Sequence, residues 1–103
     1  MVKTNIFYTT DKPKHYDAEG KLDVDVICTV VDKGLSEFIK GLTSQRFANL
    51  RAELTPSMIL ELRTAVHAGE FLGKLTDEII EACDNALKVF SDNGKVFVFC
   101  GKL

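Results

Sequence analysis

A polar stretch between two predicted strands, residues 11–17, carries the side chains best suited to binding chemistry. Tyr16 and His15 are amphipathic rings of the kind that anchor protein interfaces. Lys12 and Lys14 beside them would steer an oppositely charged partner. Long connections inside small domains are more often functional than decorative. We therefore expect this loop to contact a protein partner; the alternative is a hairpin tip that binds nothing.

Basic residues also gather in residues 33–54, which carry a net charge of +2, whereas residues 76–93 carry −4. Arg46 and Arg51 in the first segment form a second candidate patch. Such an uneven distribution of charge suits association with an oppositely charged protein or with a second copy of the chain. Nucleic acid is disfavoured as a partner because its binders usually have a stronger basic surface. The corresponding alternative is a weak nucleic-acid contact through Lys40, Arg46 and Arg51.

Asp23 and Asp25 form a different kind of candidate site at the start of a predicted strand. Residues two apart on a strand share a face and lie about 7 Å apart, so the two carboxylates would make half of a cation or acid–base site. His67, near the end of a predicted helix, could join them around a pocket for a small ligand or a hydrolytic reaction. The simpler roles are a charged strand edge and a histidine stabilised by the helix dipole.

Motifs for cofactors and metals do not occur in the sequence. It contains neither GxGxxG nor GxxxxGK[ST], and its two histidines lie in different predicted elements and form no HxxxH pair. Cys28, Cys83 and Cys100 form no CxxC pair and lie among apolar neighbours, as buried reduced cysteines do. We expect no metal and no cofactor, and we favour a non-enzymatic protein while leaving enzyme activity open.

Size and composition indicate one soluble globular domain over residues 1–103. Of the 103 residues, 46% are hydrophobic and 27% are charged, which is typical of a chain with one core. No stretch is long and apolar enough to span a bilayer. Residues 1–5 lack the apolar block of a signal peptide, so we expect a cytoplasmic protein.

Three strands are predicted, at residues 2–9, 23–31 and 95–100. The last is apolar without alternation, so it needs cover on both faces and should be an inner strand. The first two follow each other in the sequence and should pair antiparallel. Alternate residues of the second strand are expected to face the core, namely Val24, Val26, Cys28 and Val30.

Apolar residues between positions 35 and 54 recur at helical spacing, but in two phases. The first phase covers Leu35, Phe38, Ile39 and Leu42, and the second covers Phe47, Leu50 and Leu54. The two stripes are rotated relative to each other, which predicts one kinked helix or two short helices over residues 33–54.

Two further helices have clear start signals. Thr55 followed by Pro56 is typical of an N-cap and a first helical residue, and Gly69 is typical of a helix end. Thr76 is the expected N-cap of the last helix, which leads into a turn at residues 92–94. The fold class is therefore α+β. We expect a small antiparallel or mixed sheet, made of two N-terminal strands plus the C-terminal strand and covered by three to four helices, in the order β-β-α-(α)-α-α-β.

These observations favour a small non-enzymatic protein-interaction module, an inhibitor, regulator or adaptor of a larger partner, with self-association into a homodimer as a further expectation. The expected contact residues are Lys12, Lys14, His15, Tyr16, Arg46 and Arg51. The first alternative is a ligand-binding or hydrolytic pocket near Asp23, Asp25 and His67. The second is the nucleic-acid contact described above.

Overall fold

Four strands form one sheet in the computed structural model, which describes residues 4–43, 51–71 and 73–101. The strands are β1 (Thr4–Thr9), β2 (Asp25–Val31), β3 (Arg51–Leu54) and β4 (Val96–Gly101). They lie in the order β2-β1-β4-β3, and every neighbouring pair is antiparallel. The predicted α+β class and the antiparallel pairing of the first two strands are confirmed, whereas a mixed sheet is not observed.

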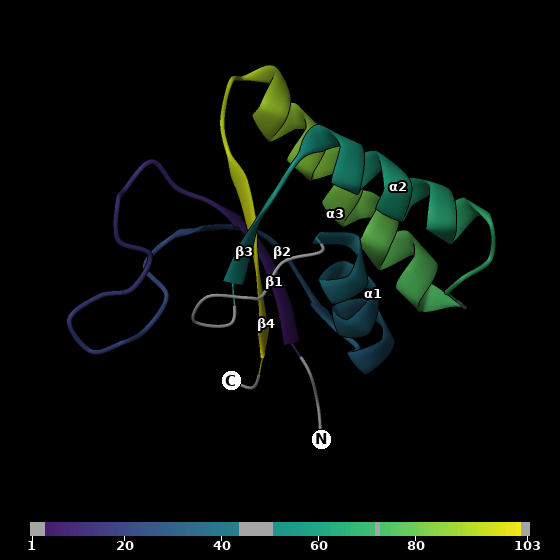
Figure 1. The fold of residues 1–103 in the computed structure, drawn as a ribbon, viewed down its shortest axis with the longest axis horizontal. Helices are drawn as coiled ribbons and strands as arrows, with labels where there is room; N and C mark the ends of the chain where they lie inside the picture. Colours follow the sequence, from purple (N-terminus) through teal and green to yellow (C-terminus); the bar gives the residue numbers. More distant parts are fainter. Residues whose placement is uncertain (1–3, 44–50, 72, 102–103) are drawn as a thin grey trace.

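Three helices cover one face of the sheet (Figure 1): α1 (Lys33–Thr43), α2 (Pro56–His67) and α3 (Lys74–Ser91). The main core lies between this helical layer and the sheet. Its sheet residues include Phe7, Val30, Val96 and Val98, and its helical residues include Leu35, Ile39, Leu62 and Ile79. Within the described parts of the chain, no helix is long and apolar enough to cross a membrane.

The segment 51–54 is a strand, so the helix predicted over residues 33–54 is wrong at its end. Ala52 and Leu54 are buried while Glu53 between them is exposed, which is the two-residue alternation of a strand. The segment pairs with β4, and this pairing raises the strand count from three to four. Apolar residues four positions apart fit both helical and strand spacing. The pairing with β4 decides in favour of a strand. The other residues of the predicted second stripe, Phe47 and Leu50, lie outside the described residues.

The apolar C-terminal strand is an inner strand, as predicted. β4 lies between β1 and β3 and directs Val96, Val98 and Cys100 toward the helices. Phe97 and Phe99 lie on the opposite face, where they belong to a second apolar cluster. The strand lacks polar alternation because both of its faces are covered.

A bulge in β2 changes the face that its residues occupy, so the predicted inward stripe is only half right. The register shifts where Phe7 pairs with Cys28 but Tyr8 pairs with Val26. Cys28 and Val30 contribute to the helix-covered core as predicted. Before the bulge, Val24 packs in the second cluster and Val26 is 57% exposed.

The helix ends follow local sequence rules at α2 and depart from them at α3. Thr55 is the N-cap of α2, where its hydroxyl accepts a hydrogen bond from the Met58 amide at 3.2 Å. Gly69 follows α2 with φ +87°, as a left-handed stop requires. The cap predicted for α3 is wrong, because this helix already begins at Lys74. The Thr76 hydroxyl instead donates to the Phe71 carbonyl oxygen.

Candidate functional site

The face of the sheet opposite the helices carries the candidate site. Directly opposed residues of antiparallel strands share a face, so Tyr8, Phe97 and Glu53 form one row across β1, β4 and β3. The next row contains Ile6, Phe99 and Arg51. The long connection between β1 and β2, residues 10–24, lies on this side of the sheet (Figure 1) and adds Leu22 and Val24 to the apolar cluster. We call this connection the loop.

His15 attaches the loop to the sheet. Its Nδ1 atom lies 2.8 Å from the Tyr8 hydroxyl, and its ring packs edge-on against Phe97 with the centroids 4.6 Å apart. Tyr8 and Phe97 are stacked with their centroids 5.5 Å apart. Only 8% of the His15 surface is exposed. His15, predicted to be an exposed contact residue, is instead a buried anchor beneath the loop.

The environment of this pair keeps both rings neutral at pH 7. Burial raises the pKa of Tyr8 to about 12, so the phenol keeps its proton. Burial, and next the positive charge of Arg51, lower the pKa of His15 below its usual value of 6.5. Tyr8 has no exposed surface, and Nδ1 is the one acceptor that the described residues offer its hydroxyl hydrogen. The phenol therefore donates to Nδ1, and the imidazole carries its own hydrogen on Nε2.

Hydrogen bonds inside the loop hold it in the shape of a small hairpin. One carboxylate oxygen of Asp17 accepts from the amides of Glu19 at 2.9 Å and Lys21 at 3.0 Å. Gly20 adopts φ +80°, which the turn requires. The Asp23 amide donates to the His15 carbonyl oxygen at 2.9 Å and closes the hairpin. The loop is therefore an ordered element.

The loop and Arg51, predicted as two separate patches, lie next to each other in the structure. The guanidinium carbon of Arg51, on β3, lies 5.2 Å from the centroid of the half-buried Tyr16 ring in the loop. Lys14 is exposed next to them, whereas Lys12 forms an exposed ion pair with Asp23 at 3.3 Å. The juxtaposition was missed because residues 51–54 were expected to be helical. Arg46 lies outside the described residues.

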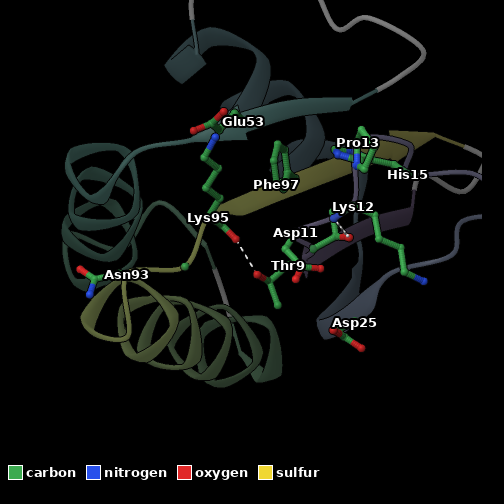
Figure 2. Close-up of a pocket in the computed structure, with 12 residues that line it drawn as sticks. Thr9, Asp11, Lys12, Pro13, His15, Asp25, Glu53, Asn93, Lys95 and Phe97 are labelled. Atoms are coloured by element: carbon green, nitrogen blue, oxygen red, sulfur yellow. Dashed lines mark hydrogen bonds between the residues drawn. The ribbon is translucent and has the colours of Figure 1, made fainter.

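Two hollows flank His15. The larger hollow, about 760 Å³, has three acids and two lysines among its lining residues, and we call it the acidic hollow (Figure 2). Its charged residues are Asp11, Asp25, Glu53, Lys12 and Lys95, and Phe97 and His15 also line it. Asp25 and Glu53 lie on opposite sides of it. The smaller, about 330 Å³, is the basic hollow, lined by Pro13, Lys14, His15, Tyr16, Asp17 and Arg51. His15 thus forms the wall between two regions of opposite charge.

The predicted group of Asp23, Asp25 and His67 is not assembled in the structure. Asp25 lines the acidic hollow, while Asp23 is paired with Lys12. His67 is the exposed last residue of α2, in the helical layer on the other side of the sheet. In the described part of the chain, no three side chains of the metal-binding types lie close enough to hold an ion.

Lys40 and the three cysteines, the remaining residues considered in the sequence, do not belong to the candidate site. Lys40 is exposed in the last turn of α1, so it lies in the helical layer, whereas Arg51 lies on the loop-covered face. Cys83 and Cys100 are buried and Cys28 is half-buried, in line with packing roles. Burial raises the pKa of the Cys28 thiol, and it raises that of Cys83 to about 12, so neither is activated as a thiolate.

Comparisons with known proteins give no relative from which a function could be transferred. No family model matches the chain, and no curated protein or solved structure matches it significantly. The geometry of the loop and the two hollows is therefore the basis for a functional proposal.

Proposed function

We propose that this chain is a small protein-interaction module that binds a larger protein through the loop and the adjoining Arg51, and so inhibits, regulates or adapts that partner. The observation that carries the proposal is the 2.8 Å hydrogen bond between Tyr8 and the buried His15. It fixes an otherwise exposed segment to the sheet. A surface ordered in advance loses less conformational entropy when a partner binds.

The exposed chemistry of this surface suits a protein partner. Tyrosine and arginine are enriched among residues that dominate binding energy, and here Tyr16 and Arg51 are stacked on each other. Lys14 next to them is exposed and available for steering. The turn around Asp17 holds these groups in one arrangement.

A capture experiment tests this proposal with three forms of the immobilised chain. These are the unaltered protein, a double variant with Lys14→Ala and Tyr16→Ala, and the control Lys40→Ala, which removes an exposed lysine from the helical layer. We expect a partner held by the unaltered protein and the control but lost by the double variant, all three having the same melting temperature. Equal capture by all three forms would refute the proposal. Light scattering of the purified chain shows whether the partner is a second copy.

A second candidate function, binding of a small ligand, is favoured by the acidic hollow. Its volume of about 760 Å³ is in the range of ligand pockets, and Phe97 provides an apolar wall beside three carboxylates and two lysines. The excess of one negative charge suits a cationic small molecule. A thermal-shift screen with polyamines, nucleotides and metal ions tests it, because a ligand that binds the folded state raises the melting temperature. Stabilisation lost on Asp25→Asn would support this function, and no shift with any compound would reject it.

A further inference from the structure

We propose that the basic hollow is a subsite for a carboxylate on an acidic segment of the protein partner, held by the Nε2 hydrogen of His15 and the side chains of Arg51 and Lys14. This inference rests on the proposed interaction function and specifies the chemistry that its surface recognises.

His15 supplies the first reason, because one of its ring nitrogens is a donor without an acceptor among the described residues. Its Nδ1 atom is occupied by the Tyr8 hydroxyl, so Nε2 carries the hydrogen. None of the described residues accepts a hydrogen bond from Nε2. Although only 8% of the residue is exposed, Nε2 itself is open to solvent, because no fully buried polar side-chain atom of the described residues lacks a partner. His15 lines the basic hollow, where a ligand oxygen would accept from this donor.

Arg51 supplies the second reason, because its guanidinium is held beside the basic hollow. The guanidinium carbon lies 5.2 Å from the centroid of the Tyr16 ring, a cation–π contact that favours this position of the side chain. The N–H groups of a guanidinium match the two oxygens of a carboxylate. Lys14 adds a second positive charge at the rim of the same hollow. Asp17, the acid in this hollow, already accepts two backbone hydrogen bonds within the loop.

The neighbouring acidic hollow favours a carboxylate on a peptide over a nucleic-acid backbone. The acidic hollow lies on the other side of His15, its three carboxylates outnumber its two lysines, and the whole chain has a net charge of −2. A single carboxylate bound in the basic hollow lies on the basic side of His15 alone. An extended polyphosphate would pass close to the acidic side and be repelled.

An NMR titration tests the subsite with three probes: a short acetylated glycine peptide with one central glutamate, the matching peptide with glutamine at that position, and a polythymidine oligonucleotide. We expect the glutamate peptide to shift the side-chain signals of His15 Nε2–H and Arg51 Nε–H, and the glutamine peptide to leave them unchanged. Arg51→Gln should weaken binding of the glutamate peptide about tenfold, the usual effect of losing one charge-assisted contact. Lys14→Gln, at an exposed loop position, should weaken it in the same direction, and the control Lys40→Gln should leave it unchanged.

Three results would overturn this inference. They are the absence of shifts at His15 and Arg51, equal weakening by Lys40→Gln, and tighter binding of the oligonucleotide than of the peptide. The capture experiment separates the two proposals. A partner that still depends on Lys14 and Tyr16, combined with a silent titration, would reject the carboxylate subsite and leave the interaction function intact. If both experiments fail, both proposals fall.

Discussion

Asn5 has no exposed surface and joins three segments of the chain through its side chain. Its amide nitrogen donates to the carbonyl oxygens of Val30 at 2.9 Å and Asp32 at 3.0 Å, and its amide oxygen accepts from the Ser36 hydroxyl at 2.6 Å. Tyr8 has the same role at the other end of β1, where it holds the loop through His15. Buried polar residues therefore fix the two ends of this central strand to their neighbours.

Replacing Asn5 with alanine should destabilise the protein by about 2–3 kcal/mol, because two carbonyl oxygens and one hydroxyl lose their partner in the interior. Asn5→Asp should cost at least as much, since it keeps the size of the side chain but places an acceptor against two carbonyl oxygens. Urea unfolding measures both effects, with the exposed Glu61→Ala as a control within about 0.5 kcal/mol of the unaltered protein. A loss below about 0.5 kcal/mol for Asn5→Ala would contradict the network.

Tyr8 should ionise at about pH 12 in the folded protein, compared with 10.0 when unfolded, because burial disfavours the phenolate. Since the folded pKa is raised, the stability linked to Tyr8 is fully present below pH 10 and is lost as the pH rises toward 12. Tyr16→Phe leaves Tyr8 as the one remaining tyrosine of the two in the chain. An ultraviolet titration of this variant measures the transition, and an apparent pKa near 10 with the fold intact would disprove the burial argument.

At the scale of elements, the turn from α3 to β4 shows how local geometry positions the inner strand. Asn93 adopts φ +62°, and the Gly94 amide donates to the Val89 carbonyl oxygen at 2.9 Å. A Cβ on Gly94 would lie 2.6 Å from a methyl carbon of Val89 and 3.0 Å from its carbonyl oxygen. The backbone therefore passes the end of α3 closely enough to require glycine before β4 begins.

Gly94→Ala should destabilise the protein by about 1–3 kcal/mol, because the side chain of Val89 can rotate away but its carbonyl oxygen cannot. Gly41→Ala is the matched control. Gly41 lies within α1, and a Cβ there has no neighbour within 4 Å. This change should stabilise the helix by about 0.5–1 kcal/mol. Chemical unfolding measures both, and effects of the same sign would contradict the close approach at Gly94.

At the scale of the whole molecule, the two faces of the sheet are covered by different kinds of structure. Helices pack against one face, while the ordered loop lies against the other (Figure 1). β1 and β4 are the inner strands, and β2 and β3 are the edges. The two inner strands thus lie directly beneath His15, which contacts Tyr8 and Phe97. The exposed valines Val26 and Val31 lie on the β2 edge.

Amide hydrogen exchange should follow this arrangement. Amides of β1 and β4 should exchange most slowly, since each strand has a hydrogen-bonded neighbour on both sides, and amides of β2 and β3 should exchange faster. Loop amides near Asp17 that donate within the turn should show intermediate protection. Exchange measured by NMR or mass spectrometry checks the order. Protection of β2 equal to that of β4 in the monomer would contradict the strand order.

Local signals in the sequence determined much of the fold. The apolar run in β4 indicated two covered faces, Thr55 and Pro56 marked the start of α2, and the α+β class followed from the order of the segments. Each of these features depends on neighbours within a few residues, so it can be predicted without knowing the tertiary structure. Residues 11–17, within the loop, were likewise singled out by their side-chain types and by the length of the connection.

Tertiary contacts alone decided the rest. Residues 51–54 are a strand because β4 offers them an edge, and the β2 bulge turns Val26 outward where the register with β1 shifts. His15 is buried because Tyr8, seven residues before it, and Phe97, far along the chain, lie beneath it. Arg51 meets Tyr16 for the same reason. Pairing between strands is set by residues far apart along the chain, and it is this pairing that builds the two hollows around His15.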